Sequence, residues 1–149
     1  MVRRQDRVPV VLDTNVIVRA LTNPAKLSAS ARVYRLWQQR QVQLVISQQL
    51  LQEYLDVLAE LGVAPERLDR FEQRLITRDT VTIVPLGRRI PVERDPADEP
   101  ILSTAASGSV KYLITLDNDL LELPIETRRR LHFEILTPAR FLKVYPKRS

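Results

Sequence analysis

Acidic side chains stand where two apolar segments of the chain end. Asp13 comes directly after the β-branched segment Val8–Leu12, and Asp117 and Asp119 come soon after Tyr112–Thr115. If such carboxylates converge, they repel one another unless a cation lies between them. Hard divalent ions such as Mg²⁺ take carboxylate oxygens as ligands. The arrangement therefore indicates a divalent-metal site, provided that the fold brings these segments together.

Two further acids belong to the same hypothesis. Asp98 begins the helical pattern that leads into Tyr112–Thr115. Glu53 belongs to the helix expected after the apolar segment Val42–Ile46, and at about 100° per residue it falls near the margin of that helix's apolar stripe. Asp56 is clearly further from the stripe, so Glu53 is the helix acid best placed to reach an edge of a sheet.

Each acid also has a purely structural interpretation. Asp13 and Asp98 are suitable N-caps for the helices that follow them. The Asp117–Asp119 segment is typical of a turn, since Asp and Asn bond to their own backbone. Glu53 is equally compatible with an ordinary solvated helix position. Only their joint placement favours a metal site.

Composition limits the kind of metal. The chain has 149 residues, no cysteine and one histidine, His132. Disulfides are therefore impossible, and a zinc site built from sulfur and imidazole is all but excluded. We expect His132 to be a surface or packing residue rather than a general base, which leaves oxygen ligands and a hard cation.

Charge is distributed unevenly along the chain. The net charge is +5 and the isoelectric point about 10.0, which suits a polyanionic partner. Residues 91–127 hold eight acidic and two basic residues, whereas residues 128–149 hold one and seven. Arg128–Arg130 form either a solvated helix face or a phosphate-binding patch, and Arg19 and Lys26 are weaker candidates for phosphate contacts.

Apolar segments of strand type alternate with helical patterns along the whole chain. The expected strands are Val8–Leu12, Val42–Ile46, Val81–Val84, Tyr112–Thr115 and Phe133–Leu136. The expected helices are Thr14–Leu21, Ser28 to about Gln41, Ser47 to Gly62, Pro65–Thr77, Asp98–Ser107 and a short one from Pro138, with Trp37 in the core. This alternation is typical of an α/β fold with a parallel sheet, in which ligands bind beyond the C-terminal strand ends where the strand order reverses.

No repeat or linker divides the sequence, so residues 1–149 are expected to form a single domain of ordinary size. The N-terminal residues Met1–Arg7 are charged and lead directly into the first strand, without the apolar core of a signal peptide. No segment is long and apolar enough to span a bilayer. We therefore expect a cytoplasmic protein with no membrane partner.

The combined motifs resemble those of PIN-domain nucleases, and more narrowly those of the toxin components of toxin–antitoxin systems. The resemblance covers Val8 to Leu142 and rests on Leu12–Val16, Ser47–Leu58, Asp98–Ala105, Thr115–Leu121 and Leu136–Leu142. It implies a three-layer α/β/α fold with a five-stranded, mostly parallel sheet. It also implies an acidic quartet with an auxiliary acid and polar groups beside it: Asp13, Glu53, Asp98 and Asp117, then Asp119, and Thr14, Asn15 and Ser47.

The resemblance further implies a function. We expect a ribonuclease that uses Mg²⁺ or Mn²⁺, with RNA as substrate, a cognate antitoxin protein as partner and a homodimer as assembly. One or two such ions can lower the pKa of a bound water and neutralise the charge that develops on a phosphodiester. Members of the family often have two or three consecutive acids around this motif, whereas here Ala97 precedes the pair Asp98-Glu99. Either of these two acids is the ligand, and Asp98 is preferred because Ala105 follows it by seven residues.

Three other functions are compatible with parts of the sequence. A phosphatase with Asp13 as nucleophile would want a second acid two residues later, where the chain has Asn15. A PIN-like module without turnover would serve as a binding partner, although the intact acidic quartet argues against it. A PIN nuclease that processes RNA outside a toxin–antitoxin system would carry the same residues.

Overall fold

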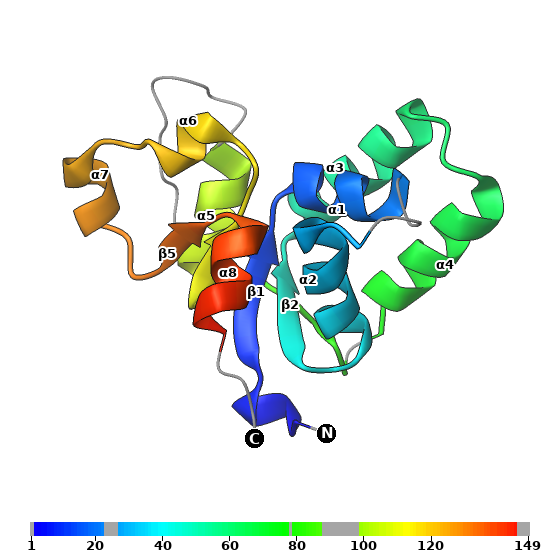
Figure 1. The fold of residues 1–149 in the computed structure, drawn as a ribbon, viewed down its shortest axis with the longest axis horizontal. Coiled ribbons are helices and arrows are strands. Elements are labelled where there is room, and N and C mark those ends of the chain that lie inside the picture. The colour runs from blue at the N-terminus through cyan, green and yellow to red at the C-terminus, as the bar shows by residue number, and fades with distance from the viewer. Residues whose placement is uncertain (1, 23–26, 78, 88–98, 146–149) are drawn as a thin grey trace.

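The sheet has five strands, all parallel, in the order β3-β2-β1-β4-β5. The computed structural model describes residues 2–22, 27–77, 79–87 and 99–145 (Figure 1). The strands are β1 (Val8–Leu12), β2 (Val42–Ile46), β3 (Val81–Ile83), β4 (Tyr112–Ile114) and β5 (Glu134–Leu136). The predicted parallel α/β fold with five strands is therefore confirmed.

The strand order reverses beside β1. From β1 the chain moves outward through β2 to β3, then returns to the other side of β1 and adds β4 and β5. The connection that follows β1 leads toward β2, whereas the connection that follows β4 leads toward β5 on the other side. The two connections therefore diverge at the C-terminal ends of β1 and β4. This divergence leaves a crevice at the ends of β1 and β4, where α/β proteins bind ligands. Asp13 and Asp117 follow these two strands.

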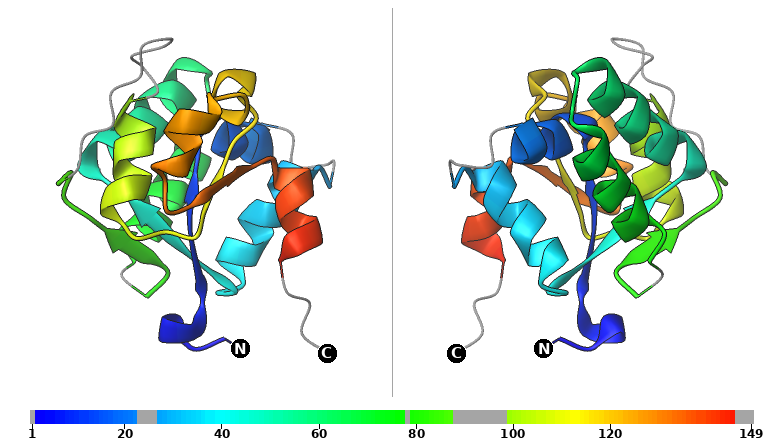
Figure 2. Two further views of the ribbon diagram at one scale, coloured as in Figure 1. Left: turned by 90° about the vertical axis from the view of Figure 1, so that its left-hand side faces the viewer. Right: turned by 90° about the vertical axis from the view of Figure 1, so that its right-hand side faces the viewer.

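Helices cover both faces of the sheet. They are α1 (Thr14–Thr22), α2 (Ala29–Gln38), α3 (Gln48–Glu60), α4 (Pro65–Leu75), α5 (Glu99–Ser107), α6 (Asn118–Leu121), α7 (Ile125–Arg129) and α8 (Pro138–Val144), after a 3₁₀ turn, η1 (Arg4–Asp6). The left panel of Figure 2 shows α2 and α8 together on one side of the sheet and α5 on the other. α1 packs against α2 and α3. The three-layer arrangement is thus confirmed.

Side-chain caps explain where several helices begin. Ser28, Ser47, Asp117 and Thr137 each accept a backbone N–H of the first turn that follows them. Proline occupies the first position of both α4 and α8, where its missing N–H costs nothing. The predicted boundaries hold to within about three residues, because hydrophobic periodicity does not register the last, fraying turn of a helix.

An aromatic cluster fills the space between α2, α3 and α4. Trp37 is fully buried, with Tyr34 and Phe71 at ring distances of 5.3 and 6.2 Å, and Tyr54 lies 6.0 Å from Phe71. The indole N–H of Trp37 donates to the Thr80 carbonyl at 3.1 Å, so its one polar group is satisfied. The prediction that Trp37 belongs to the core is confirmed.

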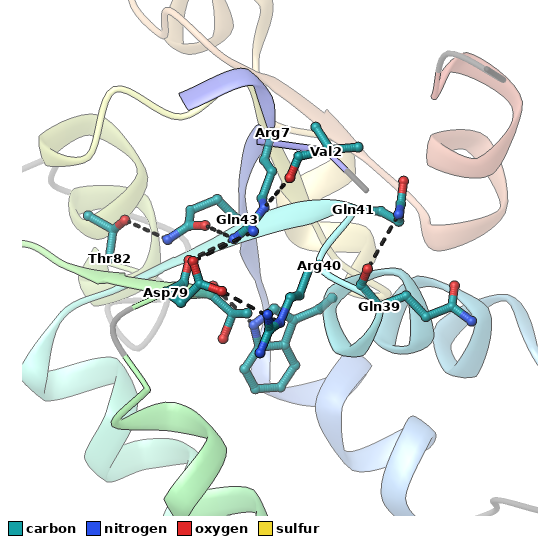
Figure 3. Close-up of polar contacts among 10 residues, drawn as sticks. Val2, Arg7, Gln39, Arg40, Gln41, Gln43, Asp79 and Thr82 are labelled. Atoms are coloured by element: carbon teal, nitrogen blue, oxygen red, sulfur yellow. Dashed lines mark hydrogen bonds and ion pairs between the residues drawn. The ribbon is translucent and has the colours of Figure 1, made fainter. Parts of the chain in front are cut away.

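A buried arginine, Arg7, stabilises the sheet at the N-terminal end of β1, away from the acids. Arg7 is 6% exposed; its guanidinium donates to the carbonyls of Val2 and Asp79 and to the Gln43 side chain (Figure 3). It also pairs with the Asp79 carboxylate at 3.6 Å, which Arg40 approaches to 3.5 Å. These contacts tie the N-terminal segment to the residues before β3.

No helix within the described part of the chain is both long and apolar enough to cross a lipid bilayer.

Candidate functional site

Asp13 is held by three donors at the C-terminal end of β1. The backbone N–H of Asp13 donates to the Ile114 carbonyl at 2.9 Å, which extends the pairing of β1 with β4 by one residue. The carboxylate accepts the N–H of Thr14 at 2.8 Å, the Thr115 hydroxyl at 2.7 Å and the Asn15 amide at 3.2 Å. Its orientation is therefore fixed from both neighbouring strand ends.

The protonation of Asp13 reflects two opposed influences. The pKa of this carboxyl is raised from 3.8 to about 6, mainly by burial and to a smaller extent by the carboxylates of Glu53 and Asp117, while the hydrogen bonds from Thr115 and Thr14 lower it. The two like charges act on Asp13 because Glu53 and Asp117 lie near it. A cation placed among them would reverse this effect by favouring the ionised form.

Glu53 approaches Asp13 from α3. It is exposed, and its carboxylate accepts the hydroxyl of Thr14, the first residue of α1. The next residue, Tyr54, is fully buried and donates its hydroxyl to the Leu12 carbonyl. Burial raises the pKa of Tyr54, and the Asp13 and Glu53 carboxylates raise it further. This tyrosine anchors the helix to the strand that precedes Asp13.

Asp117 serves the turn and the crevice at once. Its backbone N–H donates to the Thr115 hydroxyl at 2.9 Å, and its carboxylate accepts the N–H of Asp119 at 3.0 Å as the cap of α6. The same carboxylate lies close enough to Asp13 to raise the pKa of that residue. Asp119 itself is exposed on α6 and linked to the site only through its N–H. The metal-ligand and turn interpretations of Asp117 are therefore compatible.

The fourth expected acid lies outside the described residues. Asp98 falls there, and of Glu99 only the backbone at the start of α5 is described. Among the residues whose placement is described, no group of three carboxylate or histidine side chains is close enough to hold a metal ion by itself. Asp13, Glu53 and Asp117 thus surround the crevice without closing a complete set of ligands.

Two predicted polar neighbours have clear structural tasks. Ser47 is fully buried, caps α3, and shares a hydrogen bond of 2.8 Å with the Thr104 hydroxyl on α5. Thr104 in turn lies 2.7 Å from the Pro100 carbonyl, in the first turn of α5. Ser47 therefore joins the helix that carries Glu53 to the helix that follows Asp98. Asn15 accepts the N–H of Leu116 at 3.2 Å as well as donating to Asp13.

An open groove of about 660 Å³ adjoins the carboxylates. It runs between α1, α3 and the segment after β4, and its lining includes Thr14 and Asn15, which follow Asp13 in the sequence. Most of its lining is apolar, and Leu61 and Leu116 are 55% and 38% exposed. Arg19, exposed on α1, supplies its positive charge. The groove thus offers an apolar floor and a cation beside the acids.

The remaining candidates lie elsewhere. His132 is exposed and meets the Phe133 ring edge-on at 5.3 Å, as expected of a surface or packing residue. Arg128, Arg129 and Arg130 are exposed at the end of α7, where Arg128 donates to the Leu121 carbonyl. Thr115 and Tyr54 were not anticipated as groups that position the acids. Thr115 comes directly after β4, just as Asp13 comes directly after β1. This position at a strand end is the feature of the sequence that could have indicated its role.

Comparison with known proteins agrees with this geometry. A family model described as PIN domain matches residues 9–119, which is most of the chain and includes Asp13, Glu53, Asp98 and Asp117. No curated protein matches the sequence significantly. PIN domains are in general nucleases that use divalent metals. The strand order, the carboxylates at its reversal and the matched residues together establish that the chain belongs to the PIN domain family.

Proposed function

We propose that the protein is a divalent-metal-dependent ribonuclease. The observation that carries the proposal is the approach of Glu53 and Asp117 to Asp13 at the point where the strand order reverses. Three carboxylates from separate parts of the chain are costly to hold together, and a cation offsets that cost. Mg²⁺ and Mn²⁺ fit an environment that supplies oxygen ligands only.

Each acid has a distinct part in this proposal. Asp13, fixed by three donors, is the central ligand, and Glu53 and Asp117 approach it from α3 and from the end of β4. Asp98, which directly precedes α5 in the sequence, completes the proposed quartet, and Asp119 is an auxiliary acid. When bound to these acids, a divalent ion would supply an activated water and would neutralise charge on the phosphodiester. Thr14, Asn15 and Thr115 keep the carboxylates pointed at one place.

The groove supports RNA with unpaired nucleotides as the substrate. An unpaired base can lie against the apolar surface of Leu61 and Leu116, whereas a base inside a duplex keeps its faces stacked on its neighbours. Arg19 lies in the same groove and forms no ion pair with any residue that the structure describes. Its guanidinium can therefore contact a backbone phosphate of the RNA. The overall positive charge of the protein favours the approach of any nucleic acid.

We further propose that this ribonuclease is the toxin of a toxin–antitoxin pair. The support is the resemblance of its motifs to that subgroup, which also implies a cognate antitoxin, a homodimer and a place in the cytoplasm. Expression of the protein alone should arrest growth, and co-expression of a small DNA-binding protein encoded beside it should restore growth. Normal growth on expression of an active nuclease would instead favour a role in RNA processing.

The proposed activity can be tested directly. Single-stranded and duplex RNA of the same sequence are incubated with purified protein in Mg²⁺, in Mn²⁺ and in EDTA. Cleavage is expected for the single strand in the presence of metal and is expected to stop in EDTA. Binding of RNA without cleavage under every metal condition would contradict the proposal and identify a binding module that has lost turnover.

A further inference from the structure

A second pocket lies between α2 and α4, away from the acids. It encloses about 310 Å³ and is lined by Tyr34 and Gln38 of α2 and by Arg67, Arg70 and Arg74 of α4. The right panel of Figure 2 shows these two helices beside each other. Sites for small ligands range from roughly 300 to 1,000 Å³, so the volume suits a small group or a part of a larger ligand.

The three arginines of this pocket form no ion pair with any residue that the structure describes. Within the described part of the chain none of them forms a salt bridge, and no carboxylate lines the pocket. Arg67 donates to the Leu21 carbonyl, and Arg74 lies 5.9 Å from the centre of the Trp37 ring. These contacts hold two guanidinium groups in place, although like charges at short range repel each other. An anion would relieve that repulsion.

An unpartnered hydroxyl at the pocket points to the same conclusion. Tyr34 is 7% exposed, and its ring is packed against Trp37 and Phe71. Its hydroxyl makes no hydrogen bond to any residue that the structure describes and is not itself buried, so it opens onto the pocket. Burial raises the pKa of Tyr34 to about 12, although the charges of Arg74 and Arg67 lower it. The hydroxyl therefore stays protonated, close to two guanidinium groups, and is ready to donate.

We propose that this pocket binds a phosphate group. A phosphate oxygen would accept the Tyr34 hydroxyl, and the planar guanidinium groups of Arg67, Arg70 and Arg74 match phosphate with paired N–H donors. The phosphate belongs either to an RNA backbone or to a free phosphate or nucleotide. An adjoining pocket of about 520 Å³ shares Arg70 and Arg74 and is lined also by Asp69 and by Arg40, which pairs with Asp79. This binding needs no metal and does not depend on the nuclease activity.

The first test measures binding of inorganic phosphate in EDTA, by isothermal titration calorimetry at constant ionic strength. Tyr34→Phe removes only the hydroxyl, and Arg70→Gln removes an exposed charge without disturbing the core. Each change should raise the Kd at least about tenfold, as expected for a hydrogen bond to a charged group. Arg35→Gln, an exposed arginine of α2 outside the pocket, is the matched control and should leave the Kd unchanged.

Thermal unfolding separates loss of the ligand from loss of the fold. Without phosphate, Tyr34→Phe should melt no lower than the wild type, because the deleted hydroxyl has no partner to lose. Absence of phosphate binding by the wild type would overturn the proposal. The same Kd in wild type, Tyr34→Phe, Arg70→Gln and Arg35→Gln would also overturn it, since binding would then be nonspecific.

The second test identifies the source of the phosphate. Binding of a labelled single-stranded RNA is followed by fluorescence anisotropy in EDTA, with inorganic phosphate as competitor. Weaker RNA binding by Arg70→Gln and Tyr34→Phe would assign the pocket to the RNA backbone. Unchanged RNA binding together with loss of phosphate binding would assign it to a free phosphate or nucleotide. Cleavage of RNA by a protein whose pocket binds no phosphate would leave the proposed ribonuclease standing and remove this inference alone.

Discussion

The hydroxyl of Thr115 donates to the carboxylate of Asp13 at 2.7 Å, across the junction between β4 and β1. The same hydroxyl oxygen accepts the backbone N–H of Asp117 at 2.9 Å. One fully buried side chain thus sets the position of two acids that come from strands about a hundred residues apart in the sequence. The distance between these acids is a property of the sheet and changes little unless β1 and β4 separate.

Thr115 is therefore predicted to be a positioning residue. Thr115→Val keeps the shape of the side chain and removes the hydrogen bonds, so the pKa of Asp13 should rise further and the Kd for Mn²⁺ should increase roughly tenfold. Thr115→Ser keeps the hydroxyl and should restore metal binding. Titration with Mn²⁺ by calorimetry provides the measurement. Equal Mn²⁺ affinity in the valine and serine variants would show that Thr115 has only a packing role.

Asp13→Asn should abolish metal-dependent cleavage while leaving the protein folded. The substitution removes a charged ligand at nearly constant volume, and a loss of about a hundredfold or more in rate is expected for a central metal ligand. Cleavage of a labelled RNA in Mn²⁺ measures the effect, with circular dichroism as a check of folding. His132→Ala is the control and should cleave at the wild-type rate. A folded, fully active Asp13→Asn protein would exclude Asp13 as a ligand.

Divalent metal should raise the melting temperature of the wild type. A ligand that binds only the folded state stabilises it by about 2.7 kcal/mol at a concentration a hundredfold above its Kd. Glu53→Gln, Asp98→Asn and Asp117→Asn should each reduce this rise, as measured by differential scanning calorimetry with and without Mn²⁺.

Matched controls exist for these variants. Glu60 is an exposed acid of the same helix as Glu53, and Asp69 is an exposed aspartate of α4. Glu60→Gln and Asp69→Asn should leave the metal-induced rise unchanged. In EDTA the three site variants should melt no lower than the wild type, because each removes a repulsive charge. An equal metal-induced rise in all the variants would place the metal elsewhere.

The pattern of apolar residues along the sequence was sufficient to predict the five strands, the longer helices and the position of acids at two strand ends. The strands are apolar because helices cover both faces of the sheet, and parallel strands bring their C-terminal ends to one edge. The short helices α6 and α7, of four and five residues, were not delimited because they hold little more than one turn of the helical period.

Contacts between distant segments were not predictable in the same way. Tyr54 belongs to an apolar stripe, and periodicity places its ring in the core without indicating that its hydroxyl reaches the Leu12 carbonyl. Arg7 resembles any charged residue near a chain end, yet Gln43 and Asp79 satisfy it inside the fold. Similarly, Arg67, Arg70 and Arg74 form a polar helix face in the sequence, and only the packing of α4 against α2 makes them a pocket.

The stability of the metal-free protein should fall as the pH rises through about 6. The pKa of Asp13 is raised from 3.8 to about 6 in the folded state, so folding binds a proton there and the associated stability is complete only below pH 3.8. As the pH rises, the free energy of unfolding decreases, because the unfolded state loses this proton at a lower pH than the folded state does. The expected decrease is about 2 kcal/mol between pH 4.5 and 7.5. Asp13→Asn cannot ionise, so its free energy of unfolding in EDTA should gain about that amount relative to wild type over the same range. Urea unfolding of both proteins, with Asp69→Asn as control, measures the difference. A constant difference across the range would show that the pKa of Asp13 is not raised.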